Sequence, residues 1–97
     1  MNKPRQYVFH HGKPCPYCGA VMMLGTRTRP TCDHVKSRLN GGRRSNKNKL
    51  FVCSRCNSDK GHHGLVVWAA MLERDNDPRA ARVKQLVEDR RAAGLPA

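Results

Sequence analysis

Acidic side chains are scarce in the first two thirds of this chain. Residues 1–64 contain thirteen lysines and arginines but only two acids, Asp33 and Asp59. With so few carboxylates, a glycosidase pair is disfavoured and a two-metal phosphodiesterase site is hard to build. Residues 65–97, with six basic and five acidic side chains, are close to neutral. The basic character, and the binding face that it predicts, therefore belong to residues 1–64.

Long apolar runs are missing as well. Residues 1–14 contain no apolar stretch that could form the core of a signal peptide, and the run "GLVVWAAML" at 64–72 is too short to span a membrane. We therefore expect a cytoplasmic protein (in the host cell if a phage encodes it) with no membrane partner. In that compartment cysteines stay reduced and tend to bind metal ions.

The net charge of +12 on 97 residues predicts a polyanionic partner, nucleic acid before a membrane surface. The alternative is that the charge only keeps the chain soluble. A chain of this length has room for one small domain with a modest core, so an additional staple is expected.

The cysteines provide that staple. Four of the five form two CxxC pairs, "CPYC" and "CSRC", at Cys15, Cys18, Cys53 and Cys56. Thiolates at this spacing can chelate one zinc ion from two tight turns, and four of them close its coordination shell, which predicts a structural site. Two disulfides are the alternative. The remaining cysteine, Cys32, is interpreted as a small buried apolar residue on a strand.

The segments around the cysteines predict a hairpin followed by helices. "RPTCDHV" (29–35) and "KLFVC" (49–53) have the composition of strands, and the Gly- and Asn-rich basic segment between them that of a loop. A helix is expected after "CSRC", capped by Ser54, and a second one over "GLVVWAAMLER" (64–74). A last helix is expected to start at Asp77-Pro78 and to end near Ala93, before Gly94.

These pieces together carry a resemblance. "CDHV", the "GG" of the loop, the Asn of "NKLFVC" and "CSRCNSDKG" resemble, in order and interval, the motif of HNH (ββα-metal) endonucleases in their zinc-bearing four-cysteine form. Small phage HNH endonucleases are of this kind. The resemblance covers residues 15–61. It implies an α+β fold in a single HNH domain, with a basic segment at 1–14, a zinc-bound ββα-metal core at 15–64 and additional C-terminal helices at 65–97.

The resemblance also implies roles at matching positions. His34 matches the general base that takes a proton from water, and Asn48 matches the residue that holds the loop and orients this base. Asp33 and Asn57 match the ligands of one catalytic divalent cation, Mg²⁺ or Mn²⁺, in addition to the structural Zn²⁺. The implied reaction is hydrolysis of a DNA phosphodiester that leaves a 5′-phosphate and a 3′-hydroxyl. A non-catalytic, zinc-bound nucleic-acid-binding module is the alternative function.

Elementary geometry sets a condition on these roles. Adjacent side chains of a strand point to opposite faces, so Asp33 and His34 can serve one site only where the strand ends or twists. Asn57 directly follows Cys56, so the zinc would fix the start of the helix that presents it. One divalent ion beside one carboxylate has a net charge near +1, which attracts a phosphate.

Seven further basic side chains are predicted to contact the DNA backbone, which gives affinity without reading sequence, and the two histidines among them could instead assist the metal. They are Arg43, Arg44, Lys47, Lys49, Lys60, His62 and His63. The alternative is that they form a solvated loop and a solvent-facing helix end. Trp68 is expected in the core, because it lies on an apolar helical face. A homodimer and a phage packaging protein are left open as partners.

Overall fold

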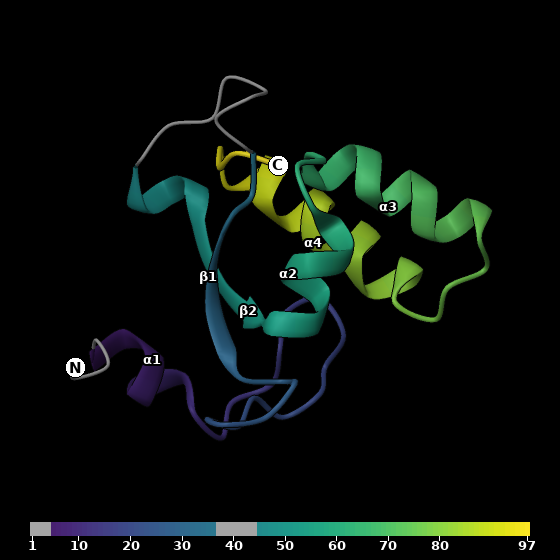
Figure 1. The fold of residues 1–97 in the computed structure, drawn as a ribbon. Helices are drawn as coiled ribbons and strands as arrows, with labels where there is room; N and C mark the ends of the chain where they lie inside the picture. Colours follow the sequence, from purple (N-terminus) through teal and green to yellow (C-terminus); the bar gives the residue numbers. More distant parts are fainter. Residues whose placement is uncertain (1–4, 37–44) are drawn as a thin grey trace.

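The computed structural model describes residues 5–36 and 45–97. The elements are helix α1 (Arg5–His10), strand β1 (Pro30–His34), the 3-10 turn η2 (Asn46–Asn48), strand β2 (Lys49–Cys53) and helices α2 (Ser54–Lys60), α3 (Leu65–Arg74) and α4 (Ala80–Ala92). This confirms the predicted small α+β fold (Figure 1). None of the helices in these described ranges is long and apolar enough to cross a membrane.

The hairpin lies at the centre of the arrangement. β1 and β2 pair antiparallel, from Pro30 opposite Cys53 to His34 opposite Lys49. Both strands lie within the segments predicted for them. Figure 1 shows the hairpin between α1 and α2, with α3 and α4 side by side beyond α2. His34 is the last residue of β1, and a strand end is where adjacent side chains can serve one site.

Helix α1 was not predicted, and it covers one face of the hairpin through aromatic contacts. Phe51 on β2 stacks on His10, with ring centroids 4.3 Å apart, and meets Tyr7 edge-on at 5.5 Å. The helix buries none of its side chains completely. The helix therefore has no clear pattern of apolar residues in its sequence, and its position depends on contacts with the hairpin.

The first CxxC pair lies in a tight knuckle. Backbone hydrogen bonds join Cys15 N to Ala20 O and Gly19 N to Cys15 O, each at 2.8 Å. Gly19 has φ +78°, a left-handed conformation that glycine adopts without steric cost. The knuckle therefore presents its two cysteines toward the interior from one short turn.

The core joins α3 and α4 to the knuckle. Trp68 is 2 % exposed and its ring lies edge-on to Tyr17 at a centroid distance of 5.2 Å. Leu72 and Val83 are buried beside it. This confirms that Trp68 belongs to the core, and it places the helix pair against the cysteine-bearing turn.

Two helix starts differ from their predicted positions. The cap of α2 is Cys53, whose Sγ accepts from Cys56 N at 3.5 Å, and Ser54 is already the first helical residue. α4 starts at Ala80, because the Asp77 carboxylate accepts from Arg79 N at 2.9 Å and closes a separate turn first. The end of α4 is as predicted, with Gly94 at φ +72° past its last turn.

The packing of α3 predicts that substitutions on its buried and exposed faces differ in their effect on stability. We expect Leu72→Ala to lower the free energy of unfolding by about 2–5 kcal/mol, because it removes a buried side chain and leaves a cavity. Val67, which is 53 % exposed on the same helix, is the matched control, and Val67→Ala should change stability by no more than about 0.5 kcal/mol. Urea unfolding of metal-saturated protein measures both, and equal effects would contradict this packing.

Candidate functional site

The four predicted cysteine ligands converge on one point. The sulfur atoms of Cys15, Cys18, Cys53 and Cys56 all lie within 4.8 Å of one another. Cys18 Sγ and Cys53 Sγ are 3.8 Å apart, close to the edge of about 3.8 Å in a zinc–thiolate tetrahedron with Zn–S bonds of about 2.3 Å. All five cysteines are free, so the two-disulfide alternative is not adopted. The cluster therefore fits a metal ion such as zinc.

Hydrogen bonds and burial within the cluster shift the pKa values of its thiols in opposite directions. The pKa of Cys15 is lowered to about 4, first by a hydrogen bond from the Cys56 thiol and then by backbone N–H groups, including that of Cys53 at 3.3 Å. The contact with Cys15 and burial raise the pKa of Cys56, and burial raises the pKa of Cys53, so Cys15 is a ligand that readily supplies a thiolate to a metal ion. Cys32 does not belong to this cluster. It is half-buried on β1, where desolvation raises its pKa.

The carboxylate of Asp33 is held inside the protein. Asp33 is 4 % exposed, and its Oδ2 accepts a 2.6 Å hydrogen bond from the Tyr17 hydroxyl. Lys60 Nζ lies 3.2 Å from the same oxygen and 3.4 Å from Oδ1. Burial, followed by the negative charge of Asp33, raises the pKa of Tyr17, so the phenol keeps its proton and donates. Asp33 is thus fixed from two sides.

The predicted phosphate contact of Lys60 requires an exposed ammonium group, and the structure places this group in the interior. The side chain is fully buried, and its ammonium group also donates to the backbone carbonyl of His34 at 3.1 Å. The last turn of α2 faces β1, so the lysine that shares a face with Asn57 turns inward with it. Burying the Asp33 carboxylate without a cation beside it would be costly, which accounts for this position.

Asn57 and His34 border the held carboxylate without contacting it. Asn57 Nδ2 donates to Thr31 Oγ1 at 3.0 Å and points toward the Cys32 carbonyl at 3.4 Å. No donor within residues 5–36 and 45–97 reaches its Oδ1. The His34 imidazole is half-buried at the end of β1 and makes no hydrogen bond to any residue in the same ranges. An amide oxygen and an imidazole therefore remain available for a ligand.

Asn48 ties the two ends of the hairpin loop together. It is 1 % exposed, its Oδ1 accepts from Lys36 N at 2.9 Å, and its Nδ2 donates to Lys36 O at 2.8 Å. Its own carbonyl accepts from Val35 N at 2.8 Å. Asn48 therefore holds the backbone of the two residues that follow His34, Val35 and Lys36.

The other predicted DNA contacts are distributed around this site. Lys49 is half-buried opposite His34 in the register, and Lys47 is exposed in η2. His62 and His63 are exposed just after α2. Arg43 and Arg44 lie outside the described residues.

Tyr17 and Arg79 are site residues that sequence reasoning missed. Tyr17 lies between Cys15 and Cys18. This position was the one available signal, because the metal-binding turn fixes the direction of a polar side chain that it contains. Nothing in the local pattern connects it to Asp33, which lies 16 residues away. Arg79 reaches Cys56 Sγ at 3.5 Å from the turn before α4, and no motif marks it.

A four-cysteine cluster, a two-stranded hairpin and a helix that starts within the cluster are the arrangement expected for a ββα-metal fold. The family model for HNH endonucleases matches residues 15–63. The chain belongs to the HNH endonuclease family, as the resemblance implied.

One relative extends the comparison beyond the matched core. CRISPR-associated endonuclease Cas9 of Corynebacterium diphtheriae is 31 % identical over 75 residues, which cover 76 % of this chain and 6 % of that protein. The chain thus corresponds to a small part of this relative's length. No solved structure matches the chain.

The cysteine cluster predicts selective metal loss. Cys53→Ser should abolish tight zinc binding, because three thiolates leave the tetrahedral shell open. Cys32→Ser is the matched control, since it removes a thiol on the paired strand, outside the cluster. Zinc content after gel filtration, measured by atomic absorption, should be about one per chain for wild type and for Cys32→Ser. Retention of zinc by Cys53→Ser would sink the assignment.

The buried pair predicts a strong effect at Lys60. Lys60→Met should lower the free energy of unfolding by about 3–5 kcal/mol, because it leaves the Asp33 carboxylate buried beside no cation. The double variant Asp33→Asn/Lys60→Met should recover part of this loss. The control is Lys84→Met, which breaks the exposed pair with Glu73 and should have little effect. Denaturant unfolding measures all three variants.

Proposed function

We propose that this protein is a metal-dependent DNA endonuclease in which His34 acts as the general base. One observation carries the proposal: an imidazole without a hydrogen-bonding partner in the described ranges follows a rigidly held carboxylate at the end of β1. This pair belongs to a chain with a net charge of +12, which attracts a polyanion. DNA is the proposed substrate, because both the charge and the family membership favour a nucleic acid.

The donor set near His34 fits one hard divalent cation. A carboxylate has about four lone-pair sites, and the three contacts from Tyr17 and Lys60 leave one of them, on Oδ1 of Asp33. Asn57 contributes an amide oxygen that has no protein donor within the described ranges. Oxygen ligands of this kind suit Mg²⁺ or Mn²⁺, which Asp33 and Asn57 would hold. When bound, such an ion stabilises negative charge on the phosphate and on the leaving oxygen.

Lys60 changes the charge balance expected for this site. Its ammonium group compensates the Asp33 carboxylate, so the formal charge with a divalent ion is about +2 instead of the +1 estimated from the carboxylate alone. The additional positive charge weakens cation binding before DNA arrives and strengthens attraction for the phosphate. Cation affinity should therefore be low in free protein and higher in the presence of DNA.

The proposed task of His34 is to remove a proton from the attacking water. An imidazole can accept that proton near neutral pH, and it must be held in direction to do so. Lys60 holds the His34 carbonyl, and Asn48 holds the backbone at Lys36. We assign Asn48 and Lys60 as positioning residues for this base.

The surrounding basic side chains are proposed to bind the DNA backbone. Lys47 lies in η2, Lys49 is the first residue of β2, and His62 and His63 follow α2. Arg43 and Arg44 are assigned the same task on sequence grounds alone. Contacts to phosphate provide affinity without base readout, so we expect strong salt dependence and weak sequence preference.

A plasmid assay tests the proposal. With Mg²⁺ or Mn²⁺, wild type should convert supercoiled to nicked DNA, and His34→Ala should lower the rate by about 10²–10⁴-fold, the usual contribution of a general base. The matched control is His11→Asn, which retains an acceptor for Leu24 N at an exposed histidine outside the site. Equal background cleavage by wild type and His34→Ala would overturn the nuclease mechanism and favour a non-catalytic DNA-binding module.

A further inference from the structure

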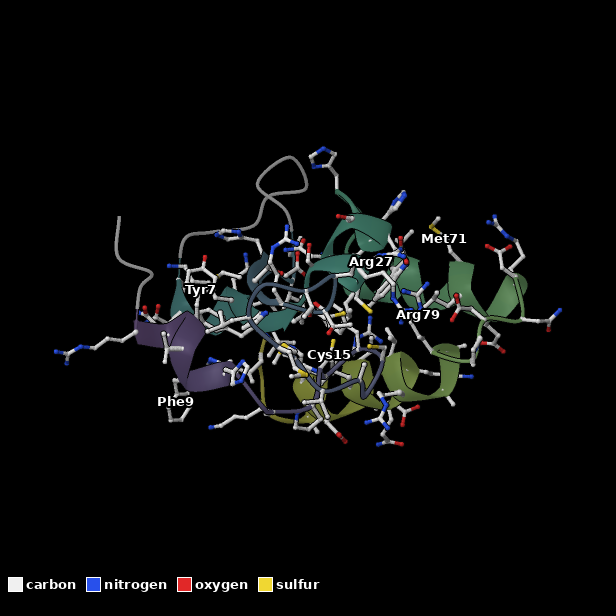
Figure 2. All side chains as sticks on the ribbon, turned by 60° about the horizontal axis from the view of Figure 1, so that its bottom comes forward. Tyr7, Phe9, Cys15, Arg27, Met71 and Arg79 are labelled. Atoms are coloured by element: carbon white, nitrogen blue, oxygen red, sulfur yellow. The ribbon has the colours of Figure 1, made fainter. Side chains whose placement is uncertain are left out.

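Arg79 lies in the turn between α3 and α4, outside the residues 15–63 that match the family, yet it reaches the cysteine cluster. Its Nη1 is 3.5 Å from Cys56 Sγ and 2.8 Å from Asp59 Oδ2 on α2. Its Nη2 and Nε donate to the two Asp77 oxygens at 2.8 and 3.0 Å. Figure 2 shows the labelled Arg79 in the central region that also contains Cys15 and the clustered sulfur atoms.

The guanidinium group is fixed from three elements. Asp77 holds it from its own turn, Asp59 from α2, and the ring of Trp68 on α3 lies 5.3 Å from its central carbon. The side chain is only 15 % exposed. A planar fork held in this way directs its N–H groups along set lines, so the contact with Cys56 is an oriented donor.

We propose that Arg79 is a positioning residue for the metal cluster, and that its N–H group on Cys56 helps to retain the ion. Four thiolates around Zn²⁺ carry a net charge of −2, and donors to the sulfur atoms stabilise that charge and orient the ligands. The two carboxylates of Asp59 and Asp77 already outweigh the single positive charge of Arg79. The effect on the sulfur therefore operates through the directed N–H bond.

This proposal assigns a task to the C-terminal helices. α3 supplies Trp68, and the turn before α4 supplies Arg79 and Asp77, so the helix pair closes over the second CxxC turn. Loss of the contact should loosen the metal even where the hairpin and α2 are intact. The proposal concerns metal retention only and does not depend on DNA cleavage.

Chelator competition on the folded protein tests it. Zinc-loaded wild type, Arg79→Gln and Arg79→Lys are titrated with a chromophoric chelator at 25 °C. We expect Arg79→Gln to lower zinc affinity by about 10–100-fold, the usual effect of removing a group that hydrogen-bonds to a ligand. The affinity of Arg79→Lys should lie between those of wild type and Arg79→Gln. Arg74→Gln is the matched control, since Arg74 pairs with the adjacent Asp75 at 70 % exposure and should leave affinity unchanged.

A spectroscopic readout separates this role from general stability. In Co²⁺-substituted protein, loss of the hydrogen bond to Cys56 should shift the thiolate-to-cobalt charge-transfer band of Arg79→Gln but not that of Arg74→Gln. A lower thermal midpoint with an unchanged competition curve and an unchanged cobalt band would overturn the proposal, as would wild type that binds no metal. If Arg79→Gln does not fold, Arg79→Lys decides: lowered affinity supports the proposal, and wild-type affinity overturns it.

Discussion

The convergence of four thiols on one point is the constraint on which the remaining structure depends. Cys15 and Cys18 come from a knuckle, and Cys53 and Cys56 come from the end of β2 and the start of α2. A chain of this size has little core, so tying these turns together replaces apolar burial that it cannot supply. The same cluster brings Tyr17 and the helix that contains Lys60 into contact with one carboxylate, that of Asp33.

That carboxylate shows how a strongly basic chain can contain a buried acid. The Asp33–Lys60 pair contributes little to net stability, because desolvating both charges offsets their attraction, but it restricts direction. The lysine gains its second contact on the His34 carbonyl, so one buried cation orients both members of the Asp-His pair. Rigidity at this point is what a general base and a metal ligand require.

The predicted and observed structures agree where local chemistry decides. CxxC spacing, the two strands, the helix at α3 and the core position of Trp68 all follow from patterns within a few residues, and these predictions are confirmed. The predictions missed α1, the start of α4 and the direction of Lys60. Each of these depends on a partner distant in sequence or on a carboxylate that competes for a backbone N–H, as at Asp77.

The sequence by itself determined the family, the cysteine ligands and the order of knuckle, hairpin and helix, because thiolate chelation and strand or helix periodicity act over short separations. Only the tertiary structure decided the partners of Asp33, which lie 16 and 27 residues away, and the return of Arg79 to a cysteine 23 residues earlier. These contacts form when the cluster and the helix pair bring separate segments together. A basic residue's identity does not show whether it will meet solvent, a phosphate or a buried acid.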